Sequence, residues 1–384
     1  MDKQTVFSGL SGNEMYCAYL LGYSPGDLIV GNSVFSMGYI GSIRTNIRTA
    51  VGGEIAAVTN MIAEGRNLSI QRFEQELMKY NGSGASGVTS KLVFHPGHTE
   101  FLTIGSAIKD SLNRGINVFT SSADAQELFC QWDSGYQPIS FVFGNVAYSI
   151  GIAKAFLGGL KSLIKGEVKQ YSDIFNTTRN LALSRIVEEA KAKGANSVVG
   201  INTEIIPFQE IGVQEMVMIG TASYNPQINS LVNPVGGVTT SDLTAEETWN
   251  IAKLGYAPIK LLLGTSVYSL GFAGGIKAGL ANLVKGEIKS LTDLIYGARE
   301  KSIDRLRDQA QEIGADDVLG IKNYITDLGS GLVEFLSIGT AVKKIDGIRT
   351  HSEQLPPQAI IKDKETYIDL SGENGLNYAN KIKT

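Results

Sequence analysis

The sequence predicts an α+β fold built from three tandem units, each containing a helix, a strand, a longer helix and two further strands. Three observations carry this prediction: a motif repeated at nearly even spacing, a capped helix at the start of each unit, and short apolar runs bounded by glycine and proline. The chain has 384 residues, which is enough for three units of ordinary domain size. The repeat has to be recognised first, because it defines the unit that folds.

The repeat is clearest in two short motifs that keep a common register. The first is Gly22-Tyr23-Ser24-Pro25, which returns 113 residues later as Gly135-Tyr136-Gln137-Pro138 and a further 120 residues later as Gly255-Tyr256-Ala257-Pro258. The second starts at Gly31, Gly144 and Gly264 and runs for eight residues, ending at Gly38, Gly151 and Gly271. We therefore divide the chain into repeat 1 (1–112), repeat 2 (113–233), repeat 3 (234–345) and a flexible polar tail (346–384).

Both helices of each unit have clear boundaries in the sequence. Capping boxes start the first helix at matched positions, in the pairs Ser11/Glu14, Asp124/Glu127 and Thr244/Glu247. A glycine then ends it, as expected for a left-handed C-terminal cap. The pattern predicts a longer amphipathic helix over about 59–80, 171–193 and 291–313.

Three apolar runs in each unit predict strands. The first covers residues 28–30, 141–143 and 261–263, and it lies between a proline and a glycine-rich segment. The other two form a hairpin, at 198–201 and 215–222 in repeat 2 and at 318–321 and 334–341 in repeat 3. A three-stranded sheet with helices on one side has two open edges, so each unit is a poor monomer. We expect the units to assemble edge to edge into a ring-like homo-oligomer.

At these residues the chain resembles the YbjQ-like family, which is named for heavy-metal binding. The similarity lies in Gly144–Ser149, the arginine early in the long helix (Arg179 and Arg299), Gly314–Ile321 and Ile338–Val342. Each repeat resembles one whole family domain without the leading helix. The resemblance implies a dodecin-like β-α-β-β unit that assembles as five-fold rings, and it implies no activity. Whole three-unit chains cannot fill one five-fold ring, so either five chains stack three rings or the ring holds a multiple of three units.

Metal binding finds little support in the residue types of this chain. It contains three histidines and two cysteines, and no histidine or cysteine occupies the same position in all three repeats. The one cluster is His95, His98 and Glu100 in the hairpin of repeat 1, and there we favour an exposed polar turn over a metal site. We expect no cofactor. Cys17 and Cys130 occupy equivalent positions, which favours two buried thiols over a disulfide.

Four charged positions are identical in the three repeats. They are Glu54, Glu167 and Glu287; Arg66, Arg179 and Arg299; Arg72, Arg185 and Arg305; and Glu100, Glu215 and Glu334. Two interpretations are open. We favour ion pairs that fix a helix against its sheet or against the next unit; the alternative is an anion pocket between units.

The glycine-rich segment after the first strand raises the question of phosphate binding. Residues 271–277 place glycines and Lys277 where a strand meets a helix, and residues 151–154 are the counterpart in repeat 2. The spacing matches neither common nucleotide-binding motif, and the lysine moves between repeats. Close backbone packing therefore explains these glycines better.

Composition narrows the class of function. With 34 basic and 38 acidic residues the net charge is −4, which provides no general attraction to nucleic acid or an anionic membrane surface. No catalytic spacing is present, and three unrepeated histidines leave little scope for acid–base catalysis. The N-terminus has no secretory pattern, and glycine and proline interrupt the uncharged stretch 134–153. We predict a cytoplasmic, non-enzymatic assembly protein; the alternatives are a module that binds a small anion or metal at unit junctions, and a membrane-surface coat.

Overall fold

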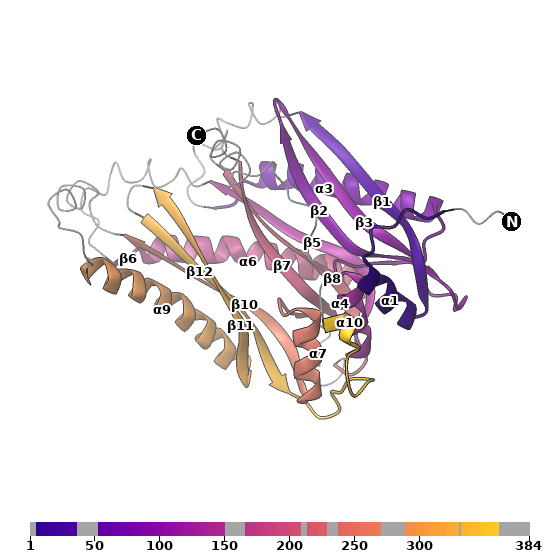
Figure 1. Ribbon diagram of the computed structural model, residues 1–384. Helices are drawn as coiled ribbons and strands as arrows, with labels where there is room; N and C mark the ends of the chain where they lie inside the picture. The colour runs from indigo at the N-terminus through magenta and orange to yellow at the C-terminus, as the bar shows by residue number, and fades with distance from the viewer. Residues whose placement is uncertain are drawn as a thin grey trace, which may run out of the picture.

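A computed structural model describes residues 5–36, 53–149, 166–208, 213–228, 237–269, 289–329 and 332–360 (Figure 1). Repeat 1 contains α1 (Gly12–Leu20), β1 (Tyr23–Ser36), α3 (Ala56–Lys79), β2 (Gly84–His95) and β3 (His98–Asp110). Repeat 2 contains β4 (Phe119–Thr120), α4 (Ala125–Asp133), β5 (Gln137–Ser149), β6 (Gly166–Glu167), α6 (Lys169–Ala192), β7 (Ser197–Phe208) and β8 (Val213–Tyr224). Repeat 3 contains β9 (Thr239–Thr240), α7 (Ala245–Lys253), β10 (Tyr256–Ser269), α9 (Lys289–Glu312), β11 (Asp317–Gly329) and β12 (Leu332–Lys344), and α10 (Pro357–Ile360) follows.

The described residues form three four-stranded sheets, in the orders β1-β3-β2-β4, β5-β8-β7-β9 and β6-β10-β12-β11. Within each repeat the long strands pair antiparallel, with the third strand in the middle. The α+β prediction is confirmed. The three leading helices carry the predicted capping boxes, with each acid at the third helical position reaching back to the cap.

The first strand of each repeat is far longer than its apolar run. β1, β5 and β10 contain 14, 13 and 14 residues. Each includes the proline that was expected to precede the strand, and the register shifts directly after it. An irregularity of this kind accommodates a residue without an N–H group, so the proline does not end the strand.

The long helix of each repeat lies directly on its own sheet at a glycine. A Cβ atom added at Gly31, Gly144 or Gly264 would lie 2.1, 2.1 or 2.2 Å from a carbonyl oxygen of that helix. Any side chain there would push the helix away, which explains why this glycine occurs in all three copies.

The same helix also packs on the sheet of the next repeat. α3 contacts β5, and α6 contacts β10. Tyr171 and Phe175 of α6 belong to one buried cluster with Leu261, Leu263 and Val267 of β10. Repeat 2 consequently lies between repeats 1 and 3, and the two outer repeats occupy opposite ends of the molecule (Figure 1).

The leading helices gather beside one another, α1 against α4 and α4 against α7. Cys17 and Cys130 are free, buried thiols in a cluster with Trp249 at this contact, as predicted. No helix in the part of the chain that the structure describes is long and apolar enough to cross a membrane.

The prediction of a flexible tail from residue 346 is wrong for residues 346–360. Asp133 of α4 holds this segment: its carbonyl oxygen accepts from His351 N at 2.8 Å, and its carboxylate accepts from Ser352 Oγ at 2.6 Å. Ala359 of α10 is buried in the cluster that contains both cysteines. Hydrogen bonds to a preformed helix cluster order the segment, so its sequence needs no apolar periodicity. The rest of the predicted tail, 361–384, lies outside the described residues.

Candidate functional site at the repeat junctions

Buried ion pairs connect each repeat to the next. Arg66 of α3 meets Glu215 of β8 through two hydrogen bonds, Nε to Oε1 at 3.2 Å and Nη2 to Oε2 at 2.8 Å. Arg179 of α6 meets Glu334 of β12 in the same way, with Nη2 to Oε2 again at 2.8 Å. None of the four side chains is more than 1% exposed. The long helices α3 and α6 thus each deliver one arginine into the sheet of the following repeat.

Neighbouring groups compensate much of the desolvation of these charges. Glu215 also accepts from Asn145 Nδ2 at 3.1 Å, and Arg66 Nη1 donates to the Ser90 carbonyl oxygen at 3.0 Å. In the second junction the Arg179 guanidinium lies over the Tyr148 ring, 4.2 Å from its centroid. Burial is the largest single effect on Arg179 and would lower its pKa, but the Glu334 carboxylate and the Tyr148 hydroxyl together outweigh it, and the net shift is upward. The Arg179 guanidinium therefore stays charged inside the protein.

In a second ion pair at each junction, the later repeat supplies the arginine and the earlier repeat supplies the glutamate. Arg185 of repeat 2 reaches back to Glu54 of repeat 1, and Arg305 of repeat 3 reaches back to Glu167 of repeat 2; each Nη2–Oε1 distance is 2.7 Å. These pairs are partly exposed. Because each repeat gives one arginine and one glutamate to its neighbour, the pairs specify which end of a repeat meets which. Glu287 lies outside the described residues.

Short contacts on both edges of the sheets cross the junctions. On one edge, Glu54 forms a bridge with Tyr148 and β6 pairs antiparallel with β10; beside them, Thr59 Oγ1 accepts from Ala147 N at 2.9 Å and Ser172 Oγ accepts from Val267 N at 2.8 Å. On the other edge, β4 pairs parallel with β2, and β9 pairs parallel with β7. Neighbouring units of one chain therefore do share sheet edges, but over two-residue strands, while the helix carries most of the contact.

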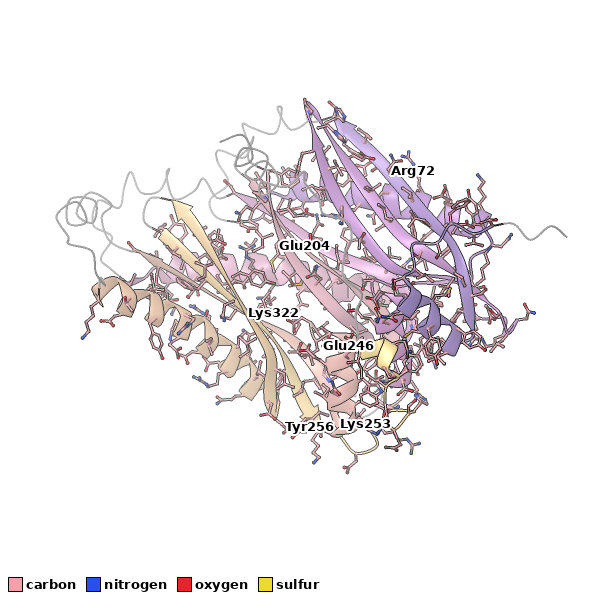
Figure 2. All side chains as sticks on the ribbon, in the orientation of Figure 1. Arg72, Glu204, Glu246, Lys253, Tyr256 and Lys322 are labelled. Atoms are coloured by element: carbon pink, nitrogen blue, oxygen red, sulfur yellow. The ribbon has the colours of Figure 1, made fainter. Side chains whose placement is uncertain are left out.

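At the two ends of the chain the same charged positions lie in different surroundings. Glu100 of repeat 1 accepts from Asn32 Nδ2 at 3.0 Å and lies 3.2 Å from His95 Nε2. Arg72 is exposed and donates to the Asn32 carbonyl oxygen at 2.6 Å (Figure 2). Arg299 of repeat 3 is exposed and lies over the Tyr296 ring at 5.2 Å.

His95, His98 and Glu100, which the sequence placed in one cluster, do come together at the β2–β3 turn. The His95 and His98 rings stack with centroids 4.8 Å apart and planes 20° apart. Hydrogen bonds from Asn32 and His95 lower the pKa of Glu100. Stacked rings direct their nitrogen lone pairs along nearly parallel planes rather than towards one point, which suits a metal ion poorly. Among the described residues, no group of three or more His, Cys, Asp or Glu side chains could hold a metal.

A cavity of about 330 Å³ opens where all three repeats meet. Its lining includes Lys91 of β2, Gln131 of α4, Glu204 of β7, Thr248 of α7 and Lys322 of β11. Figure 2 shows Glu204 and Lys322 on neighbouring sheets. Gln131 Oε1 and Thr248 Oγ1 are buried and accept or donate no hydrogen bond within the described structure. The sequence could not indicate this cavity, because residues of all three repeats line it and only the packing of the repeats brings them together.

Comparison with known proteins agrees with this architecture. The sequence profile of a family described as "Putative heavy-metal-binding" matches residues 24–109, 135–225 and 248–345. The chain belongs to the YbjQ-like family. Each of the three matches covers one repeat, so the family domain occurs three times in tandem.

Individual relatives fall into two kinds. A Mycobacterium tuberculosis protein named encapsulin nanocompartment protein is 26% identical over 240 residues, which is 61% of this chain and 89% of that protein. A UPF0145 protein of Clostridium novyi is 41% identical over 86 residues, 22% of this chain and 82% of that protein. One from Lacticaseibacillus casei is 38% identical over 96 residues, 25% of this chain and 89% of that protein. The latter two align over about the length of a single repeat.

Removing one member of a junction ion pair should destabilise the protein more than removing both. We expect Arg179→Met to lower the free energy of unfolding by about 3–5 kcal/mol, because Glu334 would remain buried without its partner. The double variant Arg179→Met/Glu334→Met should recover a large part of that loss. Urea unfolding followed by circular dichroism measures both; equal or additive losses in the single and double variants would contradict this account.

Glu189 of α6 links the stability of repeat 2 to pH. Its carboxylate accepts from Phe143 N at 2.9 Å, and burial raises its pKa from 4.5 to about 7. Between these values the folded state holds a proton that the unfolded state has lost. The contribution of Glu189 to stability therefore falls as pH rises from about 4.5 to about 7.

Glu189→Gln should remove this pH dependence. The neutral amide keeps an oxygen for Phe143 N, and repeat 3 carries Gln309 at this position. We expect the variant to be about 2 kcal/mol more stable than the parent at pH 8 and nearly equal to it at pH 4. Urea unfolding at the two pH values tests this, with the exposed neighbour Glu188→Gln as control; a gain of equal size at both values would argue against it.

Proposed function

We propose that the protein is a non-enzymatic structural protein of the cytoplasm that assembles with further copies of itself. The observation that carries this proposal is an apolar face of repeat 1 that is open in the single chain. Leu28, Val30 and Val34 of β1 are 47%, 42% and 57% exposed. Their counterparts in the other repeats are at most 6% exposed: Phe141, Phe143 and Ala147 in β5, and Leu261, Leu263 and Val267 in β10.

The difference in exposure has a simple origin. Repeats 2 and 3 each receive the long helix of another repeat on this face, α3 on β5 and α6 on β10, whereas the described residues place no such helix on this face of β1. The face belongs to β1, the outermost strand of its sheet. An open apolar face favours association, and specific self-assembly is one ordinary way to cover it.

Further observations support a structural role. The repeated charged side chains at the internal junctions neutralise one another, which leaves them unsuited to bind or transform a substrate. The free thiols Cys17 and Cys130 fit a reducing compartment. The Mycobacterium tuberculosis relative is named for a nanocompartment, a kind of protein assembly, and it aligns with 61% of this chain.

Mass photometry of the full chain at micromolar concentration tests the proposal. We expect species heavier than the 41.2 kDa chain. Val34→Glu should shift the population to single chains, because it places a charge in the face to be covered. Leu254→Glu is the matched control, since Leu254 is 67% exposed and lies at the end of α7. A parent protein that remains a single chain would refute self-assembly.

A second candidate function is the binding of a small polar ligand in the cavity between the repeats. Its volume, about 330 Å³, is at the lower end of the range for ligand sites. The buried Gln131 Oε1 and Thr248 Oγ1 supply two unused hydrogen-bonding atoms on its wall. Such atoms are costly unless a ligand or water satisfies them.

Thermal shift of the full chain against amino acids, polyamines, nucleotides, flavins and divalent cations tests this candidate. A ligand of the cavity should raise the melting temperature, and Thr248→Val should reduce the shift. Thr177→Val, an exposed threonine of α6 away from the cavity lining, is the control. A shift that Thr248→Val leaves unchanged places the ligand elsewhere.

A further inference from the structure

We propose that the open face of repeat 1 is covered by the free end of repeat 3 of a second copy of this chain. Copies would then join head to tail, through a junction that repeats the two found inside each chain. This inference rests on the proposed self-assembly and names the partner surface.

Equivalent residues of the three long helices differ in how far they are exposed. At one helix position Ile62 of α3 is fully buried and Phe175 of α6 is 3% exposed, but Ile295 of α9 is 40% exposed. At another, Thr59 and Ser172 accept backbone amides of the next repeat, whereas Thr292 is exposed. The face that α3 and α6 bury against the next repeat is therefore open on α9.

The arginine of the junction ion pair is likewise buried on α3 and α6 and exposed on α9. Arg66 and Arg179 are fully buried against glutamates of the next repeat, and Arg299 is exposed. Conversely, Glu215 and Glu334 receive an arginine from the preceding repeat, and Glu100 receives none from the residues that the structure describes. One end of the molecule presents the donor of a junction ion pair, and the other end presents its acceptor.

The surroundings of Glu100 are already those of an acceptor. Asn32 donates to Glu100 as Asn145 donates to Glu215. His95 Nε2 lies 3.2 Å from the other carboxylate oxygen, and the His95 side chain is 39% exposed. An incoming arginine would replace one partly exposed hydrogen bond with a bidentate ion pair, which is a stronger contact.

Backbone hydrogen bonds form a second part of each junction, separate from the ion pairs. Val88 N donates to the Ser121 carbonyl oxygen, and Ile201 N donates to that of Ser241, both at 2.8 Å. Ser121 directly follows β4, and Ser241 directly follows β9. At the next equivalent position, Ile321 of β11 is 43% exposed, although Val88 and Ile201 are at most 2% exposed. The outer edge of repeat 3 thus lacks the segment that covers repeats 1 and 2.

The N-terminal segment of a second copy has the right sequence position to fill that edge. Val6 and Phe7 are the counterparts of β4 and β9, and they are 37% and 76% exposed, while Phe119, Thr120, Thr239 and Thr240 are at most 5% exposed. Phe7 already accepts from Leu28 N through its carbonyl oxygen, which holds the segment along β1. Adding it to β11 of another copy would be strand addition of the ordinary kind.

One chain cannot make this junction with itself. β1 and α9 lie at opposite ends of the molecule, with repeat 2 between them (Figure 1). The two surfaces also differ, one a sheet face with a glutamate and the other a helix face with an arginine. The contact is therefore heterologous, and it requires a second copy.

Charge reversal in the full chain tests the inference. Glu100→Arg and Arg299→Glu should each weaken self-association by about 30-fold or more, because like charges would meet at the junction. An equimolar mixture of the two variants should assemble again, since each chain then finds an opposite charge at both ends. The double variant Glu100→Arg/Arg299→Glu should assemble alone. Mass photometry gives the masses, and circular dichroism melting confirms that each variant is folded.

Lys301→Glu is the matched control, an exposed residue of α9 two positions along and on another side of the helix. It should assemble like the parent. If the parent assembles and the two reversals do so equally well, or their mixture fails to assemble, the head-to-tail junction is wrong while self-assembly stands. If the parent is a single chain, the proposed function fails together with this inference.

Discussion

The architecture depends on an arginine and a glutamate that share one buried position but come from different repeats. Arg66 and Glu215 are both inaccessible to water, as are Arg179 and Glu334 to within 1%. Either charge alone in that place would cost several kcal/mol, so a repeat cannot bury its own half without a neighbour. Apolar faces can pack in several registers, whereas a bidentate pair with fixed geometry admits one. The junction is therefore specific because it is charged.

This requirement gives the long helix two surfaces to satisfy. One side lies on its own sheet so closely that a glycine is needed opposite it, at Gly31, Gly144 and Gly264. The other side faces the next repeat, with Tyr171 and Phe175 packed on β10. A helix between two sheets needs apolar residues on opposite sides. Its sequence therefore shows a weaker separation of apolar and polar sides than the sequence of a surface helix.

The sequence predicted the parts of this design that one repeat contains and missed those that two repeats share. Capping boxes act within three residues, and the matched apolar runs mark strands, so both were found. Comparing the three copies also selected Arg66, Arg179, Glu215 and Glu334. The comparison could not show which arginine pairs with which glutamate. The partners are 149 and 155 residues apart, and the three copies are equivalent in sequence. The difference between Arg179 and Arg299 is invisible in the sequence, because only position in the chain separates a buried residue from an exposed one.

The ion pairs between successive repeats also restrict the rings that whole chains can form. In a stack of five-fold rings, each chain would place one repeat in each ring, and like repeats of different chains would meet. Arg66 would then need Glu100 of another chain, but within the chain it is already committed to Glu215. Repeats of one chain follow one another along the series instead. If chain ends join by the same contact, every closed ring contains a multiple of three repeats, and a rotation that fails to close produces a filament. With the proposed head-to-tail junction, whole chains cannot make a ring of five repeats, because five is not a multiple of three.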